Sequence, residues 1–237
     1  MLTPAVFAVA FLYSSVGHAG ASGYIAAMAL FGLAPEVIKP TALALNVLVA
    51  AITSWQFRRA GHFSWSLFWP LALASVPCAL LGGYLSIPTR AFKVAVGLVL
   101  LCSAARFLVD PPAETRGEPP ALPVSLGVGA GLGLLSGLTG TGGGIFLPPI
   151  AIFLRWERTK TISAVSAAFI LVNSASGLAG HIGKTRTFPG LAWSLALAAA
   201  AGGAAGSYLG STRLPQAAIK RLLAVVLAVA GCKLIFA

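Results

Sequence analysis

Acidic residues are scarce in this sequence: Asp and Glu together number 5 among 237 residues. They fall at the ends of long apolar runs or between such runs, at Glu36, Asp110, Glu114, Glu118 and Glu157. A carboxylate proton relay or a cation site at membrane depth needs acidic side chains inside the apolar segments. The sequence excludes both kinds of site.

Cysteine is also rare, with 3 residues. Cys78, Cys102 and Cys232 lie inside apolar runs at spacings that match no metal-binding pattern. We expect them to pack as small side chains, and we expect neither a metal nor another cofactor. A signal-peptide pattern is missing too, since the first apolar run has neither a basic start nor a processed end, so no cleavable targeting segment is predicted.

Apolar residues are abundant and make up 58% of the chain, against 9% charged residues. These proportions are typical of an integral membrane protein. Lys and Arg number 16 and give a formal net charge of +11, but they lie in the short gaps between apolar runs, where cations orient helices and meet anionic headgroups. Membrane lipids are therefore predicted partners, and nucleic acid is not.

Most of the apolar runs have the length of one membrane crossing, which takes about 20 residues. These runs cover residues 40–57, 64–87, 89–109, 161–182, 188–209 and 216–236. Two further runs, 2–34 and 123–154, do not fit: the first would form a helix roughly 50 Å long, much longer than the hydrocarbon core. Each is interrupted by glycines, in SSVGHAGASG at 14–23 and SGLTGTGGG at 136–144. We predict hairpins, re-entrant loops or broken helices there.

The two interrupted runs belong to an internal duplication. A shift of about 120 positions brings Gly17, Gly20, Gly23 and Ile25 onto Gly137, Gly140, Gly143 and Ile145, and Lys39 then meets Lys160. The predicted fold is an all-α integral membrane protein with two homologous repeats. Each repeat holds a glycine-interrupted hairpin or broken helix and three transmembrane helices. The first covers residues 1–109, the linker 110–122, and the second 123–237.

The form of the interrupted element decides how the repeats are related. A hairpin gives each half an odd number of crossings and inverts the halves, whereas a single broken crossing makes them parallel. The hairpin arrangement collects most Lys and Arg on one side, and the broken crossing spreads them more evenly. The positive-inside rule therefore favours inverted repeats with both termini outside.

The interrupted segments are the candidate binding site. Backbone that leaves the helix inside a bilayer survives only where it lines a cavity or is buried in protein, and a helix that resumes at Tyr24 or Ile145 would point free N–H groups at the midplane, where they attract anions. The residues predicted to contact substrate are Ser15, Gly17, His18, Gly20, Ser22, Gly23, Ser136, Thr139, Gly140, Thr141, Gly142, Gly143, Asn173 and Ser176.

Each of these residues also has a purely structural interpretation. Serine and threonine cap helix ends, and glycine packs helices closely; for Gly202, Gly206 and Gly210 packing is the favoured interpretation. Asn173 and Ser176 share a helical face and could instead make interhelical hydrogen bonds. The corresponding crossing of the first half, after its interrupted run, carries further polar residues with the same two interpretations, namely Asn46, Thr53, Ser54 and Gln56.

His18 is the predicted proton-coupling residue. With no carboxylate in the apolar runs, it is the group best placed to carry a proton or to donate a hydrogen bond to an anion near neutral pH. The alternative is a histidine whose ring is satisfied by neighbouring carbonyl groups. His62 and His181 lie closer to helix ends, where an interfacial role is favoured.

These motifs resemble one known family. SGLTGTGGGIFLPPIAI at 136–152 and SAAFILVNSASGLAGH at 166–181, paired with GHAGASGYI at 17–25 and KPTALALN at 39–46, are similar to the TauE/SafE family of bacterial membrane proteins. The resemblance covers nearly the whole chain. It implies a multi-pass transporter of the bacterial inner membrane, associated with export of sulfite and of organosulfonates such as sulfoacetate.

The resemblance and the residues agree on a secondary transporter of small sulfur-containing oxyanions, with proton coupling through His18 left open. A passive anion channel is the alternative, because it could use the same helix ends and glycine loops. No enzymatic activity is expected: a membrane-embedded protease or metalloenzyme needs an aspartate pair, HExxH, or a serine with a base, and only the serines near His18 come close. The protein is expected to be a monomer or a homodimer.

Overall fold

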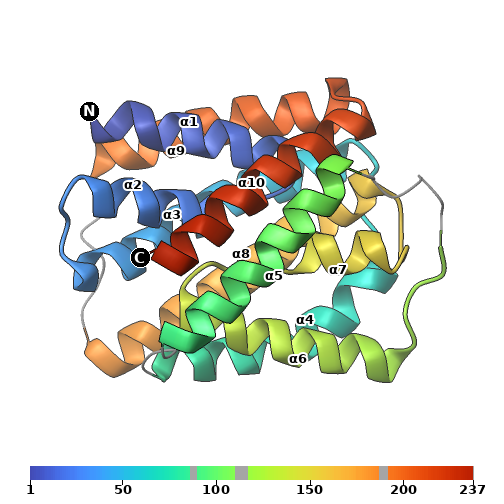
Figure 1. The fold of residues 1–237 in the computed structure, drawn as a ribbon, viewed down its shortest axis with the longest axis horizontal. Helices are drawn as coiled ribbons and strands as arrows, with labels where there is room; N and C mark the ends of the chain where they lie inside the picture. The colour runs from blue at the N-terminus through green and yellow to red at the C-terminus, as the bar shows by residue number, and fades with distance from the viewer. Residues whose placement is uncertain (86–89, 110–116, 187–191, 237) are drawn as a thin grey trace.

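The computed structural model describes residues 1–85, 90–109, 117–186 and 192–236, and within these ranges the chain is helical with no strand (Figure 1). The elements are α1 (Leu2–Ser15), α2 (Ala21–Leu30), α3 (Pro35–Arg59), α4 (Trp65–Tyr84), α5 (Arg90–Val109), α6 (Leu122–Thr139), α7 (Leu147–Phe153), α8 (Thr159–Thr185), α9 (Trp193–Tyr208), the π-helical turn η1 (Leu209–Arg213) and α10 (Gln216–Phe236). The predicted all-α membrane fold is confirmed.

A helix covers each of the runs predicted to cross the membrane: α3, α4, α5, α8, α9 and α10. Parts of the predicted ranges, residues 86–87, 89 and 188–191, lie outside the described residues. Among the described residues, four helices are long and apolar enough to span a membrane, namely α3 from Glu36 onward, α4, α6 and α8. One of these, α6, belongs to the interrupted run 123–154. That run therefore contains a helix of membrane-spanning length and not only a short re-entrant segment.

Both interrupted runs turn back on themselves. In Figure 1, α1 and α2 run in opposite directions, and so do α6 and α7. The turn between α1 and α2 is made by residues 16–20, and the turn between α6 and α7 by residues 140–146. Of the forms considered from the sequence, these segments take that of a hairpin.

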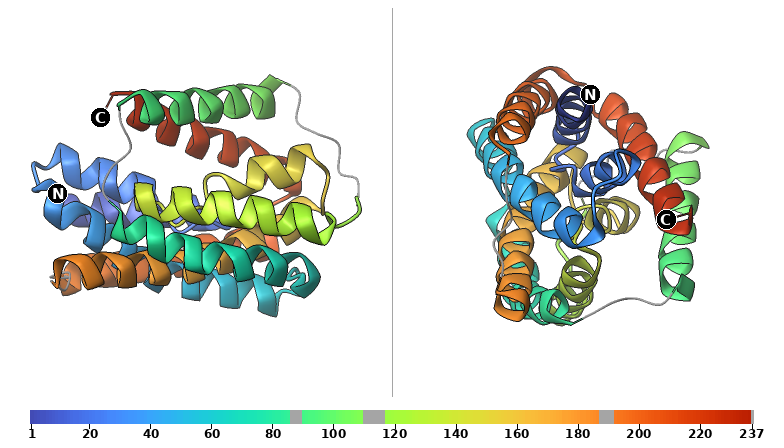
Figure 2. Two further views of the ribbon diagram at one scale, coloured as in Figure 1. Left: turned by 90° about the horizontal axis from the view of Figure 1, so that it is seen from below. Right: turned by 90° about the vertical axis from the view of Figure 1, so that its left-hand side faces the viewer.

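The loops divide between two ends of the bundle. Both termini and the loop at 31–34 lie at one end, and the loops at 60–64 and 154–158 lie at the other (Figures 1 and 2). The second end carries Arg58, Arg59, Arg155, Arg158 and Lys160. This arrangement agrees with the uneven charge distribution that the hairpin interpretation requires.

Each hairpin packs against a helix of the other half of the chain. Helix α1 packs on α9, and α6 packs on α4; α3 and α8 pack together in the middle, and α5 pairs with α10. An inverted duplication would exchange partners in this way, although the inversion itself stays a prediction.

Glycine makes these close contacts. A Cβ atom at Gly202, Gly206 or Gly210 would collide with the backbone carbonyls of Phe7, Phe11 or Ser15, so the packing interpretation of these glycines is confirmed.

Candidate functional site

The first break in the helices leaves a short glycine segment inside the protein. Helix α1 ends at Ser15 and α2 begins at Ala21, three residues earlier than the predicted restart at Tyr24. Gly17 and Gly20 adopt φ of 80° and 101°, the left-handed region that glycine tolerates best. A Cβ atom at Gly17 would overlap the backbone of Ser163 in α8, so only glycine allows this approach.

The second break is longer. Helix α6 ends at Thr139, and α7 begins at Leu147 rather than at the predicted Ile145. Its first turn contains Pro148 and Pro149, which have no N–H group. This helix end therefore supplies fewer free N–H groups than expected. The turn before the helix is shaped by Gly140, Gly142 and Gly143, which adopt φ of 71°, 73° and 76°.

Both segments present backbone N–H groups without acceptors. Within the described residues, no backbone hydrogen bond is donated by the N–H groups of residues 19–23 or of residues 141–145. All of these residues are buried. Buried N–H groups almost always have a partner, and successive free N–H groups form a concave site for an anion. The two runs therefore give the molecule a paired set of donors.

The two segments approach each other at His18. A Cβ atom built on Gly144 would lie 3.7 Å from His18 Cδ2. His18 is 1% exposed, its Nδ1 lies 3.4 Å from the carbonyl oxygen of Val16, and its ring meets that of Tyr13 edge to face with the centroids 6.4 Å apart. Its Nε2 has no partner within the described part of the chain. The histidine is thus oriented through Nδ1, and the backbone of Gly144 lies beside its ring.

Buried polar atoms without a partner are concentrated in the interior of the bundle, with His18 among them. Among the described residues they belong to the two hairpins and to the central helices α3 and α8, at Ser14, His18, Tyr24, Thr41, Asn46, Thr53, Gln56, Ser136, Ser166 and Asn173. A buried polar atom left unpaired costs about 1–3 kcal/mol. Such a concentration calls for an explanation, and bound water or a polar ligand is one.

Several predicted site residues have hydroxyl protons that are already used. Ser15 donates to the carbonyl oxygen of Leu12 at 2.7 Å, and Ser22 donates to the hydroxyl of Tyr13 at 3.0 Å. Thr139 donates to Leu135 O at 2.7 Å and lies 2.8 Å from the hydroxyl of Thr141. These side chains shape the turns, whereas the unpartnered hydroxyls of Ser14 and Ser136 remain free to donate.

Glycine packing accounts for Gly23, where a Cβ atom would lie 2.5 Å from Val9 Cγ1 within the first hairpin. The two predicted residues of α8 point to different neighbours. Asn173 donates to the carbonyl oxygen of Phe169 at 2.9 Å and keeps Oδ1 unpartnered. Ser176 donates across to Val76 O in α4 at 2.6 Å, so its hydroxyl ties α8 to α4 rather than facing the hairpins.

The site prediction omitted two residues of α3 that hold the second segment. Asn46 Nδ2 donates to Thr141 O at 3.3 Å and to Ser174 Oγ at 3.1 Å. Lys39 Nζ donates to Leu138 O at 3.4 Å, and its Cγ lies 2.9 Å from where a Cβ on Gly140 would be. The sequence carried one signal for them, because both occur in the KPTALALN motif.

Known proteins of one family are similar to this chain over nearly its whole length. The family described as "Sulfite exporter TauE/SafE" matches residues 2–234. The "Probable membrane transporter protein y4hK" of Sinorhizobium fredii (strain NBRC 101917 / NGR234) is 42% identical over 241 residues, which covers 99% of this chain and 97% of that protein. No solved structure matches the chain. The chain therefore belongs to the TauE/SafE family and is a multi-pass membrane transporter of that type.

Proposed function

We propose that this protein is a secondary transporter that exports small sulfur-containing oxyanions such as sulfite or organosulfonates. The family description supports the substrate class. In this proposal the anion lies near the membrane midplane, between the glycine segments 16–20 and 140–146. Each segment belongs to one of two inverted repeats, 1–109 and 123–237, which residues 110–122 join. The membrane is the bacterial inner membrane.

The observation that carries the proposal is the pair of buried N–H runs at 19–23 and 141–145, which have no backbone acceptor within the described residues. A sulfite or sulfonate group offers several oxygen acceptors in a small volume, and donors held in place by the fold need no reorganisation to bind them. The unpartnered hydroxyls of Ser14 and Ser136 add donors without adding charge.

Burial favours a carrier over the alternative of a passive channel. Every residue from 13 to 24 and from 140 to 149 is buried. A continuous open pore would leave part of such a lining exposed to water, whereas a carrier passes through states in which its site is closed from both sides.

His18 is the proposed coupling residue. Its Nε2 has no partner among the described residues, and it sits where the two segments meet. Protonation there would add a charge beside the bound anion, so proton and anion binding would favour each other.

Proteoliposomes test the proposal directly. We expect labelled sulfite or sulfoacetate to accumulate when a pH gradient is imposed, and His18→Ala to abolish the gradient-driven part. His62→Ala is the matched control, since His62 lies in the loop at 60–64 and its Nε2 is 3.1 Å from Ser211 O. If neither anion moves under any gradient, the substrate class is wrong; transport that is equal in both histidine variants would remove His18 from coupling.

A further inference from the structure

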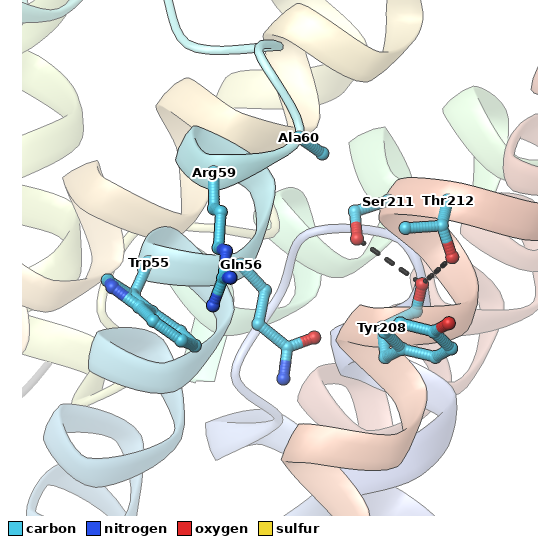
Figure 3. A pocket seen from close by; sticks show the side chains of 7 residues that line it. All are labelled: Trp55, Gln56, Arg59, Ala60, Tyr208, Ser211 and Thr212. Carbon is cyan, nitrogen blue, oxygen red and sulfur yellow. Dashed lines mark hydrogen bonds between the residues drawn. The ribbon is translucent and has the colours of Figure 1, made fainter.

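A cavity lies away from the two glycine segments, between the end of α3 and the turn η1 after α9. It has a volume of about 420 Å³, and its lining includes Trp55, Gln56, Arg59, Tyr208, Ser211 and Thr212 (Figure 3). Gln56 Nε2 donates to Ala204 O of α9 at 3.2 Å and so joins the two walls. No residue of the glycine segments lines this cavity.

The cavity has one cation and no acidic residue among the described residues that line it. The guanidinium carbon of Arg59 lies 5.4 Å from the centroid of the Trp55 ring. This distance is that of a cation–π contact. In Figure 3 both side chains lie on the α3 wall and face the space that Tyr208 closes from the opposite side. Among the described lining residues, the guanidinium is the charged group with which an anionic group would pair.

Besides the indole N–H of Trp55 and the hydroxyl of Tyr208, which can donate, the lining offers acceptor oxygens. The hydroxyls of Ser211 and Thr212 donate to Tyr208 O at 3.3 and 2.6 Å, so their protons are used and their oxygen lone pairs remain. Gln56 Oε1 is buried and has no partner within the described residues. A ligand that satisfies these oxygens must bring N–H or O–H donors.

The position of the cavity is that of a membrane interface. Trp55 and Tyr208 are 59% and 55% exposed, and they stand at helix ends beside the loop at 60–64. Half-exposed Trp and Tyr at helix ends are typical of the headgroup region. The surrounding end of the bundle is rich in arginine, which attracts lipid phosphate.

We propose that this cavity binds the headgroup of a phospholipid that combines a phosphate with a primary ammonium, as in phosphatidylethanolamine. Arg59 holds the phosphate through charge-assisted hydrogen bonds. The ammonium lies over the ring of Tyr208, which is 55% exposed, and donates to the hydroxyl oxygen of Thr212. A rotation of the Gln56 side chain, whose Oε1 is buried in the lipid-free protein, brings a second acceptor to it. A choline headgroup lacks the N–H donors, and a glycerol headgroup lacks the positive charge.

Lipid titration of the full-length protein in detergent tests the proposal, with the thermal midpoint as readout because a ligand of the folded state raises it. Phosphatidylethanolamine is compared with phosphatidylcholine and phosphatidylglycerol of the same acyl chains. We expect the ethanolamine lipid to bind about tenfold more tightly than the other two, which corresponds to one hydrogen bond to a charged group. Arg59→Gln should weaken its binding by about tenfold or more.

Two further variants test the roles of charge position and of the Gln56 amide. Arg58→Gln removes the same charge one position earlier, outside the cavity, where Arg58 lies over the ring of Phe63 at 6.0 Å, and it should bind lipid as the wild type does. Gln56→Leu should reduce the preference for ethanolamine over glycerol. Each variant is measured against its own lipid-free midpoint, which separates binding from a change in stability.

Three outcomes would overturn the proposal: equal binding of the ethanolamine and glycerol lipids, equal losses in Arg58→Gln and Arg59→Gln, or stabilisation by soluble O-phosphoethanolamine without any by the lipid. The last result would assign the cavity to a free solute with the same chemistry. These results are independent of sulfite transport, so failure here leaves the proposed function standing.

Discussion

The segment at 16–20 packs against the centre of the molecule through bare backbone, whereas the segment at 140–146 is held by side chains that reach it from α3. Gly17 lies directly on the backbone of Ser163. The second segment receives a hydrogen bond from Asn46 at Thr141 O, and Lys39 donates to Leu138 O just before it. The same glycine-rich design is therefore fixed in place by two different means.

The hairpins also differ in the polar groups they leave unpaired. The first leaves Ser14, His18 and Tyr24 with unpartnered atoms, whereas the second, among its described residues, leaves the Ser136 hydroxyl. A group that is buried without a partner reduces stability and is retained most often where it has a function. We therefore expect the first hairpin to supply more of the side-chain contacts to a ligand, and the second segment to depend on side chains of α3 that hold its backbone in place.

The strongest test of the support that α3 gives to the second segment is Gly142→Ala. Gly142 has φ of 73°, and a Cβ atom there would lie 2.6 Å from Asn46 Nδ2 and 3.0 Å from Ile170 Cγ2. Both the left-handed backbone and the overlap oppose the methyl group, so we expect a loss of about 3 kcal/mol or more and little folded protein. Yield of monodisperse protein and the thermal midpoint measure this.

Gly61→Ala is the control for that experiment. Gly61 has φ of 78°, and a Cβ atom there would have nothing within 4 Å, so only the backbone cost of about 1 kcal/mol applies. Equal stability of the two variants would mean that the second segment can move away from α3. The support that we assign to α3 would then be wrong.

Much of the fold follows from local sequence features, which explains why it could be predicted. Apolar runs of membrane length became helices, and the glycines at 17, 20, 140 and 143 mark the turns because few other residues tolerate their backbone angles. The helix starts were less accurate. The restart of α7 was misplaced by two residues, since Ile145 and Phe146 continue the turn before Leu147.

The contacts that hold the site could not be predicted in the same way. Asn46 and Lys39 each bond to residues more than 90 positions away in the sequence. The periodicity of α3 does not indicate which helices of the other half its polar face contacts. The shared helical face of Asn173 and Ser176 likewise did not indicate their partners. Helix α8 packs closely on α4, and the Ser176 hydroxyl therefore donates to Val76 O.

The next largest effect is expected for Asn46→Ala. The substitution removes the bonds from Asn46 Nδ2 to Thr141 O and Ser174 Oγ and leaves that carbonyl unpaired in a buried site. We expect a loss of about 2 kcal/mol in stability, together with weaker substrate affinity because the turn that presents residues 141–145 loses its support. Thermal unfolding and the KM for transport are the measurements.

Ser176→Ala separates support of the turn from general helix packing. It removes one interhelical hydrogen bond, to Val76 O in α4, and should cost about 1 kcal/mol without changing KM. A rise in KM of the same size in both variants would mean that the site responds to any loosening of α8, and the specific role of Asn46 would be contradicted.

The smallest effect on stability, and the most informative one on function, is expected for Ser14→Ala and Ser136→Ala. Each removes a buried hydroxyl that has no partner within the described residues, so the ligand-free protein should be as stable as the wild type or slightly more stable, by about 1 kcal/mol at most. If the hydroxyls donate to the anion, KM should nevertheless rise in both variants, and more for Ser14, because the first hairpin holds more of the free polar groups.

Ser22→Ala provides the contrast, since that hydroxyl is already bonded to Tyr13 and its loss should lower stability slightly with little change in KM. Reduced stability with unchanged transport in Ser14→Ala and Ser136→Ala would mean that both hydroxyls serve the fold, and the division of roles between the two hairpins would no longer hold.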